Sequence, residues 1–241
     1  MKSIFVVVLL ALVSACATYV TPGAGVPLKM PSTPEEDADA LVAVEPRARF
    51  PARIAIARVQ APDYYAKGTT CQGSGKYCVV ITREAETEKE MERIARFPEV
   101  AGLAPIVRLS TPASFQSHRD LRSMAANLKA DILLLYSIDT AFRVDTKSFG
   151  PLDVISLGML PKKNTYVRAT ASALLLDVQT GFVYGEAEAT ASEENNASGW
   201  STVEKIEAAR LRTESAGFQR LVSEVEKLWA DVVKEHGGKQ N

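Results

Sequence analysis

Cysteine and histidine are scarce in this chain, and neither sign of charge dominates it. Among 241 residues there are three cysteines and two histidines, and 28 basic residues against 29 acidic ones leave a formal net charge of −1. The balanced charge argues against a nucleic-acid-binding protein. Hydrophobic residues still make up 46% and charged residues 24% of the chain, which is the composition of a folded globular protein and excludes a disordered chain or a collagen.

Catalytic signatures are missing as well. The sequence contains no nucleophile elbow, no phosphate-binding Walker loop, no His-Glu-x-x-His zinc motif and no dinucleotide-binding glycine pattern. Nucleophilic hydrolysis needs a base beside the nucleophile, and we expect the two histidines, His118 and His236, to lie on the surface at the ends of helices. We therefore expect a protein that is not an enzyme and that holds no metal and no cofactor.

The N-terminus carries a more specific signal. Lys2 precedes an apolar run over residues 4–13, which is too short to span a bilayer as a helix but is typical of a secretory signal. The run leads into the tetrapeptide VSAC, which ends at Cys16 and resembles a bacterial lipobox. That resemblance implies that residues 1–15 are removed and that Cys16 is acylated. The alternative is an ordinary signal peptide cleaved near Ala15.

Acylation of Cys16 would fix where the protein resides. Two or more acyl chains suffice for stable anchoring, so we expect a soluble body tethered to a membrane by residues 16–49, a segment with five prolines and little periodic apolar content. Ala17 stands where an aspartate would favour retention in the inner membrane. The resemblance therefore implies an outer-membrane lipoprotein that faces the periplasm.

The two remaining cysteines, Cys71 and Cys78, are expected to form a disulfide bond. Export places them in an oxidising compartment, and the six residues between them include two glycines that let the chain turn back. A zinc site is the alternative, but the spacing is wider than that of zinc motifs and no histidine lies nearby.

Residues 50–236 are predicted to form a single α/β domain, followed by a frayed tail over residues 237–241. We expect a mixed, largely antiparallel sheet, with helices mainly on one face and a long C-terminal helix. The expected elements, in chain order, are a strand at 52–59, a short strand at 79–81, a helix at 83–97 capped by Thr82, a strand at 103–109, a helix capped by Ser117, a strand from 132 to about 144, a hairpin of strands at 165–177 and 182–192, and a helix from a cap at Ser201 to about 235 in which Gly217 marks the place for a break.

The predicted hairpin turns at Asp177 and Gly181, and its strands alternate between small apolar and polar residues. One face then suits close packing of a helix, and the other faces solvent. The expected apolar face comprises Val167, Ala169, Ala171, Ala173, Leu175, Val183, Ala187, Ala189 and Ala191. The expected polar face comprises Tyr166, Arg168, Thr170, Ser172, Tyr184, Glu186, Glu188 and Thr190. Our candidates for partner binding are Tyr64 and Tyr65 in the loop after the first strand, with Tyr166, Arg168, Tyr184, Glu186 and Glu188 on the polar face.

Three segments together resemble a group of bacterial envelope proteins that includes CsgG-like proteins, the N-terminal domain of TolB and LpoB-like lipoproteins. They are the strand ARIAIARV, the stretch LRSMAANLKADILLLYSIDT and the hairpin ATASALLLDVQTGFVYGEAEAT. The segment around LPKKN, residues 160–164, is more specifically similar to the rhombotarget lipoproteins. The resemblance covers roughly residues 50–195 and implies a fold used for binding and assembly rather than for catalysis.

These observations lead to one main functional expectation and two alternatives. The main expectation is a non-enzymatic, membrane-anchored envelope lipoprotein that binds a protein partner or supports assembly of an envelope complex. A subunit of a CsgG-like secretion channel is the first alternative, although residues 139–165 are too few and too interrupted by proline and glycine to form two membrane hairpins. The second is a cell-wall glycan hydrolase that uses the carboxylates of Glu186 and Glu188.

Overall fold

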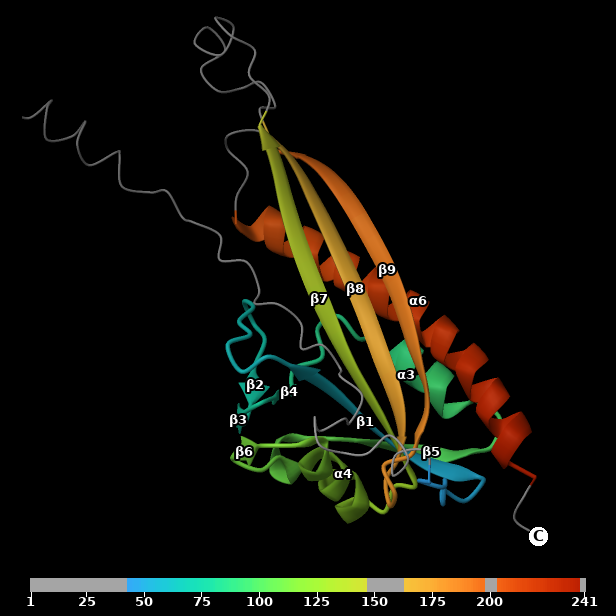
Figure 1. Ribbon diagram of the computed structural model, residues 1–241. Helices are drawn as coiled ribbons and strands as arrows, with labels where there is room; N and C mark the ends of the chain where they lie inside the picture. Colours follow the sequence, from blue (N-terminus) through green and yellow to red (C-terminus); the bar gives the residue numbers. More distant parts are fainter. Residues whose placement is uncertain (1–42, 147–162, 198–202, 239–241) are drawn as a thin grey trace, which may run out of the picture.

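The computed structural model describes residues 43–146, 163–197 and 203–238, and it has the expected mixed α/β architecture (Figure 1). The lipobox with Cys16 and the helix cap expected at Ser201 lie outside these residues. The described elements, in chain order, are β1 (Ala52–Gln60), β2 (Cys71–Gln72), β3 (Ser74–Gly75), β4 (Cys78–Val80), α3 (Glu88–Ala95), β5 (Val100–Pro105), the 3-10 helix η1 (Arg108–Ser110), β6 (Ser114–Phe115), α4 (His118–Asn127), β7 (Ile132–Thr146), β8 (Lys163–Asp177), β9 (Val183–Ala197) and α6 (Val203–His236).

A seven-stranded sheet in the order β2-β4-β1-β7-β8-β9, with β5 also pairing with β1, carries the fold. β1 runs parallel to β5 and β7 and antiparallel to β4, so it occupies the central position that its apolar residues on both faces favour. β7, β8 and β9 are each 15 residues long and pair in antiparallel fashion. Beyond Tyr136, the last β7 residue that pairs with β1, they extend as a projecting arm (Figure 1).

Helices cover both faces of the sheet near its base, two on one face and one on the other. α3 and α6 pack on the face that carries Leu134, Ala171 and Leu175. α4 packs on the opposite face through Leu121, Met124 and Ala125, against strand residues such as Leu133 and Leu135. The sequence predicted a single apolar face for the hairpin, but the base of the sheet is apolar on both sides.

α6 is one continuous helix of 34 residues, and it does not break at Gly217. Gly217 is buried where the helix crosses β8, and a Cβ atom at this position would lie 3.5 Å from the carbonyl oxygen of Ala169. The small side chains of Ala169, Ala171 and Ala173 allow the same close approach from the sheet side. Gly217 therefore lies where the helix packs directly on β8, and it does not break the helix.

The helix expected over residues 83–97 is shorter than predicted, because its first residues are used elsewhere. Thr82 does not cap a helix: its hydroxyl oxygen accepts a hydrogen bond from the N–H of Thr70 at 2.8 Å. Glu86 turns into the core, where it binds Arg58. The helix α3 begins only after Thr87, which lies at the N-cap position.

The strand expected over residues 103–109 is displaced towards the N-terminus. β5 pairs with β1 only as far as Ile56, because β4 takes the same edge of β1 from Arg58 onward. The chain then leaves the sheet and forms η1. Leu109, expected inside a strand, is 99% exposed.

The cap predicted at Ser117 is confirmed. The carboxylate of Asp120 accepts hydrogen bonds from the backbone N–H groups of Gln116 at 2.8 Å and Ser117 at 2.9 Å. These two bonds lower the pKa of Asp120 below its ordinary value. They satisfy N–H groups at the start of α4, which is the physical basis of a capping box.

Candidate partner-binding face and buried charge network

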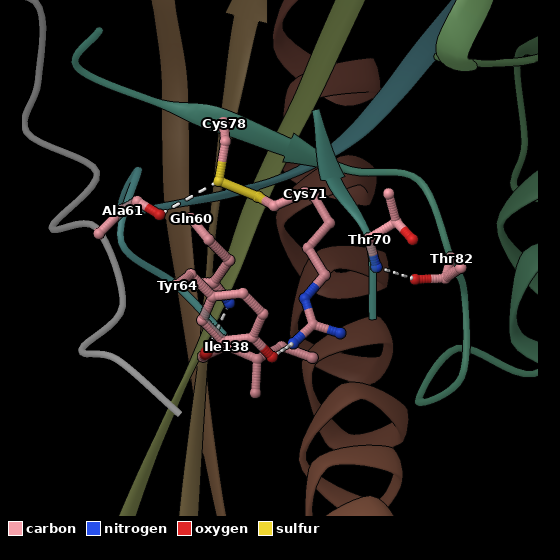
Figure 2. The surroundings of a disulfide bond; sticks show 9 residues. Gln60, Ala61, Tyr64, Thr70, Cys71, Cys78, Thr82 and Ile138 are labelled. Carbon is pink, nitrogen blue, oxygen red and sulfur yellow. Dashed lines mark hydrogen bonds between the residues drawn. A yellow bond between two sulfur atoms is a disulfide. The ribbon is translucent and has the colours of Figure 1, made fainter. Parts of the chain in front are cut away.

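The predicted disulfide between Cys71 and Cys78 is present, and it closes the hairpin of β2 and β4 (Figure 2). The Sγ atom of Cys78 lies 3.1 Å from the carbonyl oxygen of Ala61. Because a disulfide sulfur carries no hydrogen, this is a close contact rather than a hydrogen bond. Both cysteines are consumed by the bridge, which leaves no thiolate there for the alternative zinc site.

A network of buried charges lies next to this hairpin, between the sheet and α6. Arg58 projects from β1 towards α6 and forms ion pairs with Glu86 at 3.2 Å and with Glu214 of α6 at 3.3 Å. The hydroxyl of Tyr136 donates a hydrogen bond to Glu86 at 3.0 Å. The side chains of Arg58, Glu86 and Glu214 are at most 3% exposed, so the network belongs to the interior.

The same network continues along α6. Arg210 is 1% exposed and pairs with Glu214 at 2.7 Å and with Glu207 at 2.5 Å, one helical turn to either side. Glu214 also accepts a hydrogen bond from the hydroxyl of Thr140 at 2.8 Å. Two arginines thus meet three carboxylates at 3.3 Å or less, and Glu84 lies at the edge, 3.8 Å from Arg210, in a region that one α helix, two strands and the segment before α3 enclose. We call Arg58, Glu86, Glu207, Arg210 and Glu214 the buried charge network.

The ionisation of these arginines follows from their neighbours. Burial lowers the pKa of Arg58 by desolvation, but the charges of Glu86 and Glu214 more than offset this and raise it above its ordinary value. The pKa of Arg210 is raised in the same way, chiefly through its bonds to Glu207 and Glu214. Both arginines are therefore cationic throughout the pH range in which proteins are studied.

Tyr64 is not available as a partner contact, contrary to the prediction. Its side chain is only 7% exposed, and its hydroxyl oxygen accepts a hydrogen bond from Arg58 at 3.1 Å. Desolvation raises the pKa of the Tyr64 hydroxyl. The adjacent Tyr65 is 60% exposed, as a surface contact requires.

The polar sheet face lies on the side of the projecting arm that faces away from α6. We define it as the outward side chains of three strands, which are Asp139, Ala141 and Arg143 of β7, Tyr166, Arg168, Thr170 and Ser172 of β8, and Glu186, Glu188, Thr190, Ser192 and Glu194 of β9. All are exposed or half-buried. Predicted residues Tyr166, Arg168, Glu186 and Glu188 thus share one surface.

Cross-strand contacts order this face into rows. The hydroxyl of Ser172 donates a hydrogen bond to the carboxylate of Glu188 at 3.0 Å, and the hydroxyls of Thr170 and Thr190 lie 3.2 Å apart. At the outer end the guanidinium of Arg143 lies 6.0 Å from the centre of the Tyr166 ring. Short polar side chains in the middle and larger ones at the ends make a broad platform.

Tyr184, predicted to lie on the polar face, lies on the opposite face. A β-bulge between Leu175 and Leu176 shifts the register, so that Gly185 pairs with Leu175 and Val183 with Leu176. Side chains before the bulge therefore change faces. Val183 moves to the α4 side for the same reason, and Tyr184 packs on the α6 side.

Tyr184 belongs to a cluster that holds the segment before β1 and the end of α6 against the sheet. Its hydroxyl donates to Asp177 at 3.2 Å, and the same carboxylate oxygen accepts the N–H groups of Arg47 and Ala48. Desolvation, followed by the charge of Asp177, raises the pKa of Tyr184. His236 packs edge-to-face against Tyr184, and its side chain is 15% exposed, so the surface position expected for it is wrong.

Sequence reasoning missed the buried charge network, although the pattern contained signals for it. Arg58 follows four apolar residues, 54–57, of a strand that carries apolar residues on both faces. Glu207, Arg210 and Glu214 have the helical spacing that continues the apolar stripe of Phe218, so charges occupy core-facing positions. A charge at an inward position needs a partner in the core, and that requirement could have paired them.

No protein-family model matches the chain, and no curated protein matches its sequence. Among solved structures, a protein from Helicobacter pylori described as a homologue of the neuraminyllactose-binding hemagglutinin has a TM-score of 0.39 at 9% identity, covering 80% of this chain and 94% of that one. Protein XCC0632 from Xanthomonas campestris has a TM-score of 0.34 at 10% identity, covering 78% and 91%. Lipoprotein GNA1162 from Neisseria meningitidis has a TM-score of 0.29 at 13% identity, covering 66% and 94%. These are remote likenesses in fold, and we transfer no residue role from them.

Two further results concern the described residues alone. Within residues 43–146, 163–197 and 203–238, no cluster of three or more histidine, cysteine, aspartate or glutamate side chains could hold a metal ion. None of the helices in this part of the chain has the length and apolar character to cross a membrane.

Proposed function

We propose that the protein is a non-enzymatic lipoprotein of the bacterial envelope, anchored through acylated Cys16 and bound to a protein partner through its polar sheet face. The observation that carries the proposal is the lipobox-like VSAC directly after a short apolar run. The proposed location is the periplasmic side of the outer membrane, where the disulfide between Cys71 and Cys78 is stable.

The chemistry of the polar sheet face supports a partner with a basic surface. β9 contains four glutamates and no lysine or arginine. On the face itself Asp139, Glu186, Glu188 and Glu194 outnumber Arg143 and Arg168, which leaves a net charge of −2 by that count. Complementary charge speeds association and selects partners, so a cationic protein surface fits this platform.

Photo-crosslinking in intact cells tests the proposal. A photoreactive amino acid at Ser192, which is exposed on the polar sheet face, is expected to capture a defined envelope protein. The control is the same amino acid at Lys227, an exposed position on α6. Capture of the same proteins from both positions, or of none from Ser192, would contradict binding at this face.

Charge reversal provides a matched pair of variants. Glu186→Lys with Glu188→Lys is expected to abolish the Ser192 crosslink, whereas Asp231→Lys with Glu235→Lys on α6 is expected to leave it unchanged, because all four carboxylates are exposed but only the first two lie on the platform. Surface substitutions of this kind usually change the free energy of unfolding by less than about 0.5 kcal/mol. Loss of binding would therefore not reflect loss of folding.

A further inference from the structure

The segment from β5 to β7 concentrates positive charge in a chain that is slightly acidic overall. Residues 106–131, which connect the two strands, contain Arg108, Arg119, Arg122 and Lys129 but only Asp120 and Asp131 as acidic residues, for a net charge of +2, whereas the whole chain has −1. β9 has the opposite character, with four glutamates and no basic residue. Two of these glutamates, Glu193 and Glu194, pair with Val167 and Tyr166 in the outer part of the projecting arm.

The same segment exposes apolar side chains. Leu109 in η1 is 99% exposed and Val107 is 47% exposed, and with Tyr65 they are the large exposed hydrophobic residues of the described chain. Arg108 lies between them and is itself exposed. An apolar side chain in full contact with water, next to a cation, is the pattern of a surface that binds at a membrane interface.

The loop after η1 and α4 together form one surface. A shallow hollow of about 380 Å³ lies between them, and Leu109, Pro112, Ser123 and Met124 are among the residues that line it. α4 lies at the end of the molecule opposite the tip of the projecting arm (Figure 1). We call the loop 107–112 together with α4 and Lys129 the basic underside.

The N-terminal segment joins the folded body near this end. The N–H groups of Arg47 and Ala48 donate to Asp177, at the turn between β8 and β9. Arg122 of α4 binds the same turn through the carbonyl oxygens of Val178 and Gln179. An anchor ahead of Arg47 would therefore reach the body beside α4.

We propose that the basic underside docks on the anionic surface of the membrane to which the chain is anchored, with Leu109 inserted at the interface. This proposal rests on the lipid anchor of the proposed function. Anionic lipid attracts Arg108, Arg119 and Lys129. Because α4 lies opposite the tip of the projecting arm, docking of this end points the arm away from the bilayer and leaves the polar sheet face open to a partner (Figure 1).

The test uses the lipidated protein reconstituted in vesicles of phosphatidylethanolamine and phosphatidylglycerol. With Cys16 acylated and the other two cysteines bridged, Leu109→Cys supplies the single thiol for an environment-sensitive fluorophore. The emission of this probe is expected to shift to the blue and to be quenched by lipids brominated in their acyl chains. The matched control is Tyr65→Cys, an exposed position in the loop after β1, whose probe is expected to stay in water.

Charge removal sharpens the test. Arg108→Gln and Arg119→Gln are each expected to reduce the docked fraction roughly fivefold, and added salt to reduce it further. If the protein floats with the vesicles but its probe at position 109 behaves like the one at position 65, docking is wrong while the anchor stands. If the probe shifts without bromine quenching, the surface contacts protein, which also overturns the proposal. If the protein does not float, the proposed function itself fails.

Discussion

The two halves of α6 are held to the sheet by different physics. The C-terminal half buries Phe218, Leu221, Val225 and Trp229 against the strands. The N-terminal half buries Glu207, Arg210 and Glu214 instead, at most 8% exposed. Apolar burial stabilises in proportion to area. Burial of charges costs desolvation that the ion pairs offset only when their geometry is complete.

Because of this difference, the N-terminal half of α6 tolerates fewer changes in geometry than the C-terminal half. Arg58 Nε and Glu86 Oε2 are buried and have no hydrogen-bond partner among the described residues, so part of the network is unsatisfied. Such a network adds little net stability compared with an apolar core, but it fits only one position of α6 against β1 and the segment before α3. We therefore expect the apolar half to supply stability and the charged half to fix the position of α6.

Breaking the network at its centre has the largest expected effect. Arg210→Met removes the cation between Glu207 and Glu214 and leaves Arg58 as the cation paired with Glu214, which is expected to lower the free energy of unfolding by about 3–5 kcal/mol. Urea unfolding measures this directly. Leu221→Ala in the apolar half is expected to cost about 2–5 kcal/mol through cavity formation.

A rescue experiment distinguishes the loss of stability in Arg210→Met, which comes from unbalanced charge, from the loss in Leu221→Ala, which comes from a cavity. Adding Glu207→Leu and Glu214→Leu to Arg210→Met removes the two carboxylates that had paired with Arg210, while Arg58 keeps its ion pair with Glu86, and most of the lost stability is expected to return. If the triple variant is no more stable than Arg210→Met alone, the charged half owes its role to packing and the contrast between the halves disappears.

The disulfide is expected to stabilise the hairpin of β2 and β4, which lies next to the buried charge network. Replacing Cys71 and Cys78 by alanine opens a loop with a sequence separation of seven, which is expected to cost about 2–3 kcal/mol through the greater freedom of the unfolded chain. The loss is to be measured by thermal unfolding of the oxidised protein and the variant. Equal stability of the two would show that contacts such as the one between Thr70 and Thr82 suffice to hold the hairpin.

Alkaline pH provides a separate test of the buried charge network, because Tyr136 donates a hydrogen bond to Glu86. Desolvation raises the pKa of Tyr136 well above its ordinary value of about 10. Above that pH the unfolded chain loses the proton while the folded protein keeps it, so stability is full below pH 10 and falls by up to about 1.4 kcal/mol per pH unit for this tyrosine. Tyr136→Phe is expected to flatten the fall, and an unchanged slope would exclude the tyrosine as its source.

Gly217, at the junction of the two halves, offers the smallest effect and the opposite sign. The Cβ atom of an alanine would meet Ala169 at ordinary contact distance, 3.5 Å from its carbonyl oxygen and 3.7 Å from its Cβ. Because alanine favours a helix, Gly217→Ala is expected to raise the free energy of unfolding by roughly 0.5–1 kcal/mol. A loss of stability would mean that the junction must bend, and chemical denaturation detects either result.

Much of the fold could be predicted from local pattern. Alternation placed β8 and β9, a cap at Ser117 placed α4, and the spacing of Cys71 and Cys78 in a chain expected to be exported indicated the disulfide. Each of these features depends on residues close in sequence, where propensity and turn chemistry decide the outcome.

The predictions that proved wrong concern features that depend on contacts between residues far apart in the sequence. The shortened α3 depends on Glu86 binding Arg58, and the position of β5 depends on β4 taking the same edge of β1. The misplaced Tyr184 depends on a bulge opposite Leu175 that no local signal marks. Tyr64 was predicted to be a surface contact because aromatic residues in loops are enriched at interfaces, but its hydroxyl accepts a hydrogen bond from the buried Arg58.

The central claim is that a lipid on Cys16 confines this folded body to the bacterial envelope. Growth with labelled palmitate tests it most directly, with Cys16→Ser as the control. We predict that the mature protein carries the label, begins at Cys16 and loses the label in the variant. An unlabelled protein that retains Met1 and resides in the cytosol would contradict the account.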